Sequence, residues 1–204
     1  MREANIVFSL VAATAFATTA TQARNLILNP GFELDGHDLC NQAPLDWNYT
    51  PAPPVSGGGF LIEYSDTNGI AAHSGSFSAI FGNLSDQDDI IFQSLPTITG
   101  ATYDFNFWLD NEYSQSGTYF TASWGGTTVL QINPTDSTAT SGWTDFDFTE
   151  VATGPTTVSF AGRNYPSAAG LDDVSVTAVP EPGAAGLFGL GFAVLMARRR
   201  RQIQ

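Results

Sequence analysis

The sequence contains no lysine, and its seven basic residues are all arginines, against 20 acidic residues in a chain of 204. Eighteen of the acidic residues lie between Arg24 and Val179, where Arg24 and Arg163 are the only basic residues, so this stretch carries a net charge of −16. A surface of this sign repels phosphate backbones, which argues against nucleic-acid binding, and it attracts cations such as calcium.

Cysteine is nearly absent as well. The single residue, Cys40, excludes an internal disulfide, so the fold has to be held together by its core. Cys40 follows His37 and Asp38 in the segment GHDLC, but one cysteine and one histidine without a second pair do not define a zinc site. We interpret Cys40 as a thiol in a loop.

Groups typical of catalysis are also scarce. The only other histidine, His73, precedes Ser74, and the segment GSFSA lacks the Gly-x-Ser-x-Gly pattern of hydrolases. Acidic pairs such as Asp88 and Asp89 resemble the two carboxylates of glycosidases, but 20 acidic residues produce such pairs by chance. We therefore expect a binding or structural protein rather than an enzyme, with a glycosidase as the most remote alternative.

The first 23 residues form a separate segment. Arg2 precedes an apolar run from Ile6 to Phe16, and small residues follow up to Ala23. This order is typical of a secretory signal peptide that signal peptidase cleaves after Ala23. A buried N-terminal helix is the alternative, but no polar residues organise a second face.

The region from residue 24 to residue 178 has the pattern of an all-β domain. In TYDFNFWLD, Tyr103 and the alternate residues after it share one face, and Asp104, Asn106 and Trp108 share the other. Similar short segments follow one another, separated by turn residues such as GG, TG and NPTDSTATSG. The sequence therefore predicts an antiparallel sandwich, and we favour a jelly roll.

Four segments of this domain resemble the jelly-roll proteins related to carbohydrate-binding modules of the galactose-binding-like type. They are NLILNPGFEL, HSGSFSAIFG, IFQSLPTITGATYDFNFWL and GLDDVSV, and the likeness covers roughly Asn25 to Ala178. The resemblance implies a structural calcium ion shared by the opening and closing motifs, which here are Glu33 and either Asp172 or Asp173. Strand alternation places Asp172 on the face of Val174 and Val176, where a carboxylate needs a partner, so we prefer Asp172. Backbone carbonyls near Asn29 and in the HSGS loop would complete the coordination. The alternative is that both acidic residues only cap loops.

A glycan-binding surface is a further hypothesis. Trp108 shares its strand face with Asp104 and Asn106, and an aromatic ring can stack on a sugar while amides and carboxylates bind the hydroxyls. Gln93, Trp124 and Arg163 are additional candidates, as are Asn164 and Tyr165. Aromatic residues in strands are more often part of the core, and Trp47 and Trp143 are interpreted in this way.

The last 26 residues, 179–204, form a third segment. Here VPEP, made of Val179, Pro180, Glu181 and Pro182, precedes an uncharged run from Gly183 to Ala197 and then Arg198, Arg199, Arg200 and Arg201. This arrangement resembles the PEP-CTERM sorting signal, which implies recognition by an exosortase, a membrane protease-transpeptidase of bacteria that produce exopolysaccharide.

Elementary membrane physics agrees with this resemblance. The 15-residue run reaches about 22 Å as a helix, which is short of a hydrocarbon core of about 30 Å. Four arginines remain on the cytoplasmic side by the positive-inside rule, so the domain lies outside, as a signal peptide requires. The sequence thus predicts a short transmembrane helix that anchors the chain transiently, with an ordinary tail anchor as the alternative.

Together these observations predict an exported protein of the cell surface or extracellular matrix, associated with exopolysaccharide. A carbohydrate-binding module with a defined glycan ligand is the alternative.

Overall fold

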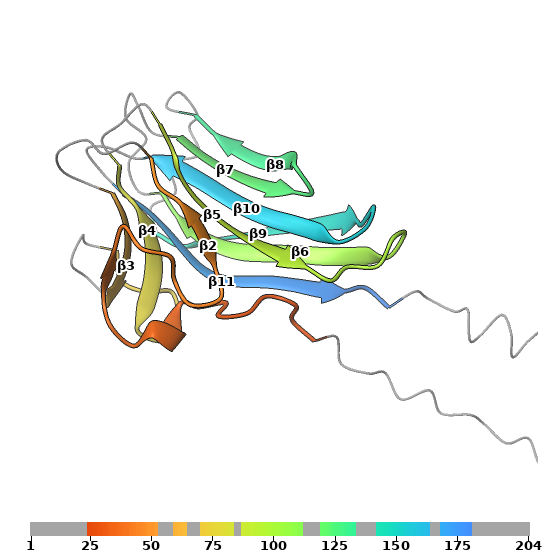
Figure 1. Cartoon of the computed structure of the whole chain (residues 1–204), viewed down its shortest axis with the longest axis horizontal. Coiled ribbons are helices and arrows are strands. Elements are labelled where there is room, and N and C mark those ends of the chain that lie inside the picture. Colours follow the sequence, from red (N-terminus) through yellow and green to blue (C-terminus); the bar gives the residue numbers. More distant parts are fainter. Residues whose placement is uncertain are drawn as a thin grey trace, which may run out of the picture.

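The computed structural model describes residues 24–52, 59–64, 70–83, 87–111, 119–133, 142–163 and 168–180. They form two antiparallel β-sheets packed face to face, with one short 3-10 helix, η1 (Glu33–Asp35) (Figure 1). The predicted all-β antiparallel sandwich is therefore confirmed. The predicted signal peptide (residues 1–23) and the chain after Pro180 lie outside the described residues.

Strands adjacent in each sheet come from distant parts of the chain. The first sheet has the order β1 (Leu39–Cys40), β3 (Phe60–Tyr64), β4 (Phe77–Phe81), β11 (Ala169–Ala178), β6 (Thr102–Asp110), β9 (Thr144–Val151). The second has the order β2 (Asn48–Thr50), β5 (Asp89–Leu95), β10 (Thr156–Arg163), β7 (Tyr119–Trp124), β8 (Thr127–Ile132). From β5 onward, most connections cross from one sheet to the other, so consecutive strands of the chain usually belong to different sheets.

Phenylalanine dominates the core between the sheets. Along β6, Phe105, Phe107 and Leu109 are fully buried, as the alternation in TYDFNFWLD predicts. Phe160 of β10 meets Phe107 edge to face, with ring centroids 5.0 Å apart. Trp47 packs in the same core, 6.2 Å from Phe160. Such aromatic burial supplies the stabilisation that a disulfide-free domain needs.

A β-bulge interrupts β11 and changes one prediction. The pairing of β11 with β6 shifts between Asp172 and Ser175, and Asp173 has a left-handed backbone with φ of 49°. Asp172 pairs with Trp108 and shares its outward face, whereas Val174 and Val176 are buried in the core. The prediction that Asp172 lies on the face of these two valines is therefore wrong, because the extra residue reverses the alternation.

The two ends of the described chain meet at β11. The Leu26 amide donates to the Val176 carbonyl (2.8 Å), and the Asn25 side chain binds the backbone of both Val174 and Val176. Beyond β11, the Val179 amide donates to the Thr102 carbonyl (2.9 Å). Both described termini therefore lie at one end of the sandwich, opposite η1 (Figure 1).

Within the described parts of the chain, no helix is long and apolar enough to cross a membrane. The apolar run predicted to do so, residues 183–197, lies outside them.

Candidate functional site

The candidate site lies where the loop of residues 70–76 crosses the outer face of the first sheet. Asp172 is fully buried beneath this loop, and its Oδ2 accepts hydrogen bonds from the backbone amides of His73 (2.9 Å) and Ser74 (3.1 Å). At the other end of the loop, Glu33 Oε1 accepts from the amides of Ser76 (2.7 Å) and Phe77 (2.8 Å). Two carboxylates from opposite ends of the chain therefore hold one loop.

Asp173, the residue at the bulge, binds the side chains of the same loop. Its Oδ2 lies 2.7 Å from His73 Nδ1, and its Oδ1 accepts from the Ser74 hydroxyl (2.7 Å). Ser74 and His73 thus both bind the aspartate, and Ser74 does not donate to the imidazole. The order differs from that of a nucleophilic triad, in which the histidine is the base for the serine.

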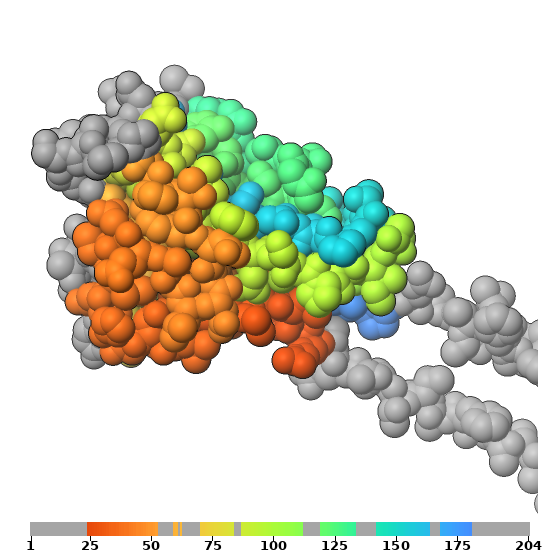
Figure 2. Space-filling model, in the orientation of Figure 1, coloured from red at the N-terminus to blue at the C-terminus, as the bar shows by residue number. Residues whose placement is uncertain are grey.

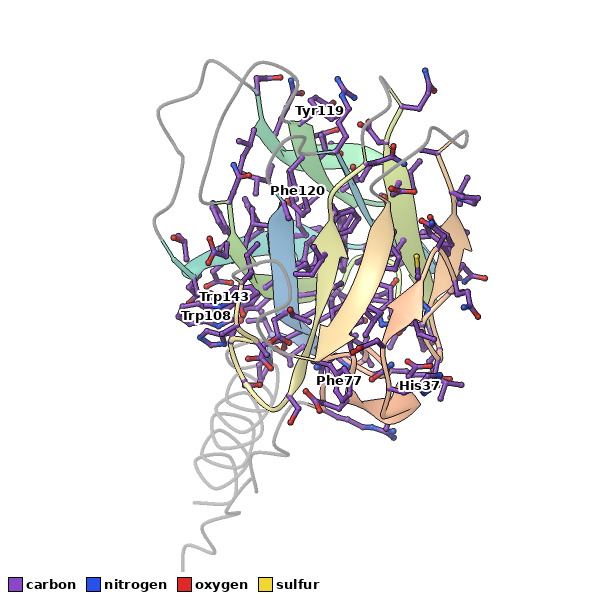
Figure 3. All side chains as sticks on the ribbon, turned by 90° about the vertical axis from the view of Figure 1, so that its left-hand side faces the viewer. His37, Phe77, Trp108, Tyr119, Phe120 and Trp143 are labelled. Carbon is purple, nitrogen blue, oxygen red and sulfur yellow. The ribbon has the colours of Figure 1, made fainter. Side chains whose placement is uncertain are left out.

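His73 also joins an aromatic cluster. Its ring stacks on Trp108, with centroids 3.9 Å apart and planes inclined by 16°, and meets the edge of Trp143 at 5.7 Å. The Trp143 indole donates to the Ala71 carbonyl (2.9 Å) and packs against a small cluster of Ile70, Ile80 and Ala168. Figure 3 shows the two tryptophans side by side.

Of the predicted glycan-binding residues, Trp108, Asn106 and Asp104 do share the outward face of β6. Asn106 donates to the Asp145 carboxylate, and Asp104 accepts from the Thr149 hydroxyl of β9 (3.4 Å). One face of the Trp108 ring is covered by His73, so this ring is not a bare platform.

The additional glycan-binding candidates have other roles. Gln93 and Trp124 are buried, and Gln93 donates to the carbonyls of Leu28 and Asp46. Arg163 pairs with Asp88 and lies 4.8 Å from the centroid of the Tyr119 ring. Residues 164 and 165 lie outside the described chain. Cys40 does not lie in a loop as predicted, because it is the second residue of the edge strand β1. Its thiol is free and exposed.

Asp89, the first residue of β5, shows the same use of a buried carboxylate. It accepts from the Tyr49 hydroxyl (2.7 Å), the Ala52 amide (3.0 Å) and Asn83 Nδ2 (2.9 Å). Burial and this contact raise the pKa of Tyr49 above its usual value. Asp89 is thus fully engaged in holding β2 and its following loop.

The predicted calcium ligands differ in how well their surroundings suit a cation. Among the described residues, no group of three or more histidine, cysteine, aspartate or glutamate side chains is arranged to hold a metal ion. Gly31 nevertheless leaves a space beside two carboxylates. A methyl group at its Cβ position would lie 3.4 Å from Asp172 Oδ1, 3.6 Å from Asp173 Oδ1 and 3.8 Å from Glu33 Cγ. The oxygens that face this space suit a hard cation.

The side chains of His73 and Trp143 are parts of this site that the sequence alone did not assign to it. The contact of His73 with Asp173 spans 100 residues of sequence, and the register of β6 with β9 brings Asp145 beside Trp108. The segment HSGS is the one local signal, since its turn residues predict a loop but not what the loop covers.

Residues 178–201 match the PEP-CTERM protein-sorting motif. The match indicates export with processing by exosortase-type sorting machinery and a transient C-terminal membrane anchor. Of the predicted sorting residues, Val179 and Pro180 are described, and they directly follow β11. Glu181, Pro182 and Arg198 to Arg201 lie outside the described chain.

The fold is similar to solved structures of several kinds, whereas no curated protein matches the sequence. A Stig cyclase from Fischerella sp. TAU has a TM-score of 0.58 at 17% identity, over 78% of this chain and 99% of that one. TmCBM61, solved with β-1,4-galactotriose, has a TM-score of 0.53 at 17% identity, over 76% and 99% of the two chains. A cleaved adhesin domain of Lys-gingipain has a TM-score of 0.50 at 17% identity, over 74% and 96%. At these identities the likeness shows the fold alone.

The buried carboxyl of Asp172 makes stability depend on pH. Burial raises its pKa to about 7, against the lowering effect of the backbone N–H donors, while an aspartate in an unfolded chain titrates near 3.9. The folded state therefore binds this proton more tightly. The resulting stabilisation is complete below pH about 4 and is lost as the pH rises to about 7, by at most roughly 4 kcal/mol.

We expect the free energy of unfolding, measured by urea titration, to fall between pH 4 and pH 7, and Asp172→Asn to flatten this dependence. Asp145→Asn, an exposed carboxylate on the same sheet face, is the control for general charge repulsion and should keep the slope. Equal slopes for both variants would mean that Asp172 is not the titrating group.

Proposed function

We propose that the protein is exported by its signal peptide and anchored briefly in the inner membrane by residues 183–197. An exosortase-type enzyme then processes it near Val179, Pro180, Glu181 and Pro182, and the domain joins the cell surface or the extracellular polysaccharide matrix. The observation that carries this proposal is the sorting motif at residues 178–201, directly after the last strand. The four arginines supply the cytoplasmic stop.

The domain in this proposal is a jelly roll that acts by binding or as a structural part, without catalysis. His73, the histidine that precedes Ser74, binds Asp173 and stacks on Trp108. Both contacts hold the loop in place, and neither orients the imidazole toward the serine hydroxyl. The adhesin and carbohydrate-binding structures of similar fold support this role as analogies of fold.

Processing predicts that the mature protein outside the cell lacks residues 198–204. Mass spectrometry of the external protein should find no peptide ending in RRRRQIQ. Replacing Pro180, Glu181 and Pro182 together by alanine should leave the tail attached and the protein in the membrane fraction. Thr177→Ala, just outside the matched residues, should be processed normally. Recovery of the arginine cluster on external protein would contradict the proposal.

A structural calcium ion is a further part of the proposal. Asp172 and Asp173 would supply carboxylate oxygens in the space beside Gly31, with Glu33 as the third acidic side chain at its edge. An ion held there would connect the region of Gly31 and Glu33 to the last strand. Because it would bind only the folded state, it would stabilise that state.

We expect the melting temperature to rise with calcium and fall with chelator, corresponding to about 2.7 kcal/mol at a hundredfold excess over Kd. Glu33→Gln, Asp172→Asn and Asp173→Asn should reduce the response. Gly31→Ala should reduce it as well without removing a charge, because its methyl group fills the space. Asp145→Asn should respond as the wild type does. If all variants respond alike, calcium acts on the diffuse acidic surface and the site is wrong.

Binding of a defined glycan is the second candidate function. The outward face of β6 and β9 favours it, because Asn106 and the carboxylates of Asp104, Asp145 and Asp147 lie there beside Trp108. Side chains of this kind bind sugar hydroxyls.

If this function is correct, a glycan array should show binding that is lost in Asn106→Ala and weakened in Trp108→Ala. Asn48→Ala, an exposed amide on the second sheet, is the matched control and should bind normally. An absence of binding to every glycan, with retention at the cell surface, would favour a purely structural role.

A further inference from the structure

The end of the sandwich where the described chain leaves the domain differs in chemistry from the rest of the surface. We call residues 96–101, 151–155 and 179–180 the exit end; Figure 2 shows its parts together in green, teal and blue. None of these residues is charged, although the stretch between Arg24 and Val179 carries a net charge of −16. Glu150 and Glu181 border it in the chain, and Arg24 precedes Asn25, which binds β11.

The exit end is contiguous and well ordered by hydrogen bonds. Val179 binds Thr102, and Thr102 pairs with Val151 across β6 and β9. The Gly100 amide donates to the Ala152 carbonyl (2.8 Å), and the Thr97 hydroxyl donates to the Gly154 carbonyl (2.6 Å). Its backbone groups are therefore largely occupied within the domain, which lowers the cost of placing them near lipid.

Two apolar side chains project from this end. Ile98 is 69% exposed and Val151 is 56% exposed, and the other residues of the exit end are threonine, glycine, alanine, proline and valine. Val151 follows Glu150 and lies at the end of the outward face of β9, two positions beyond Thr149 and four beyond Asp147. The domain thus presents apolar tips on an uncharged surface at the point where the sorting motif begins.

The tail fixes how far this end can lie from a membrane. Two residues, Glu181 and Pro182, separate Pro180 from Gly183, the first residue of the uncharged run, so the two positions lie at most about 10 Å apart. The headgroup layer alone is about 5 to 8 Å thick. Because the 15-residue run is shorter than the hydrocarbon core, the mismatch draws the flanking residues further into the interface.

We propose that the exit end rests on the phospholipid bilayer while the tail is anchored, with Ile98 and Val151 inserted at the headgroup level and the acidic surface directed away. This inference rests on the proposed anchoring of residues 183–197. Its partner is the lipid surface itself. An uncharged contact avoids the repulsion that an acidic end would meet from anionic lipids, and apolar tips gain by leaving water.

The test uses the chain from Arg24 to Gln204 in vesicles of phosphatidylcholine and phosphatidylglycerol. Cys40→Ser combined with Ile98→Cys gives one labelling position for an environment-sensitive fluorophore. Cys40→Ser combined with Leu34→Cys is the matched control, since Leu34 is 60% exposed on η1 at the opposite end. Spin-labelled lipids then quench any fluorophore at headgroup depth, and flotation of the vesicles reports whether the tail has inserted.

We expect both proteins to float with the vesicles and quenching at position 98 to exceed that at position 34 by about twofold or more. Val151→Asp in the position-98 protein should reduce its quenching without preventing flotation. Flotation with equal quenching at the two positions overturns the inference and leaves the anchoring intact. Failure to float overturns the anchoring and the inference with it.

Discussion

The hydrogen bond from a backbone amide to a buried carboxylate is the interaction on which this structure depends most. Asp172 lies fully buried at the centre of the first sheet and accepts from two consecutive amides of the loop that covers it. Glu33 holds the other end of the same loop through the amides of Ser76 and Phe77, and Asp89 accepts from the amide of Ala52. These N–H donors favour the charged form of Asp172 and so offset part of the cost of burying its carboxylate. With one cysteine the chain can form no internal disulfide, and without lysine it has only its seven arginines as permanent cations for ion pairs.

These carboxylates also connect parts of the chain that the sheets do not. Glu33 belongs to η1 near the start of the described chain, and Asp172 and Asp173 belong to the last strand. All three bind residues 73–77. The loop in turn carries His73 onto Trp108. The aromatic cluster and the space beside Gly31 thus both depend on acidic side chains that accept hydrogen bonds from the backbone of this loop.

The sequence predicts the sheets of this protein better than its loops. Alternation in TYDFNFWLD correctly separates buried Phe105 and Phe107 from outward Asn106, because a regular strand has a fixed period of two. The same reasoning fails at Asp172, because a bulge adds a residue that alternation does not register. The stacking of His73 on Trp108 depends on the path of a loop and on sheet order, and neither is encoded in local pattern.

The place of β11 has a consequence for the order in which the chain folds. It is the last strand in sequence, yet it lies between β4 and β6 in the first sheet, and Asn25 binds it across 149 and 151 residues of sequence. Until β11 is available, β4 and β6 are not joined in the first sheet, and Asn25 lacks its partners on β11. A chain that is threaded through a membrane from its N-terminus meets this condition only when almost its whole length has crossed. Such non-local closure is slow compared with local pairing. The topology thus delays completion of the first sheet until its last strand is on the same side of the membrane as the others.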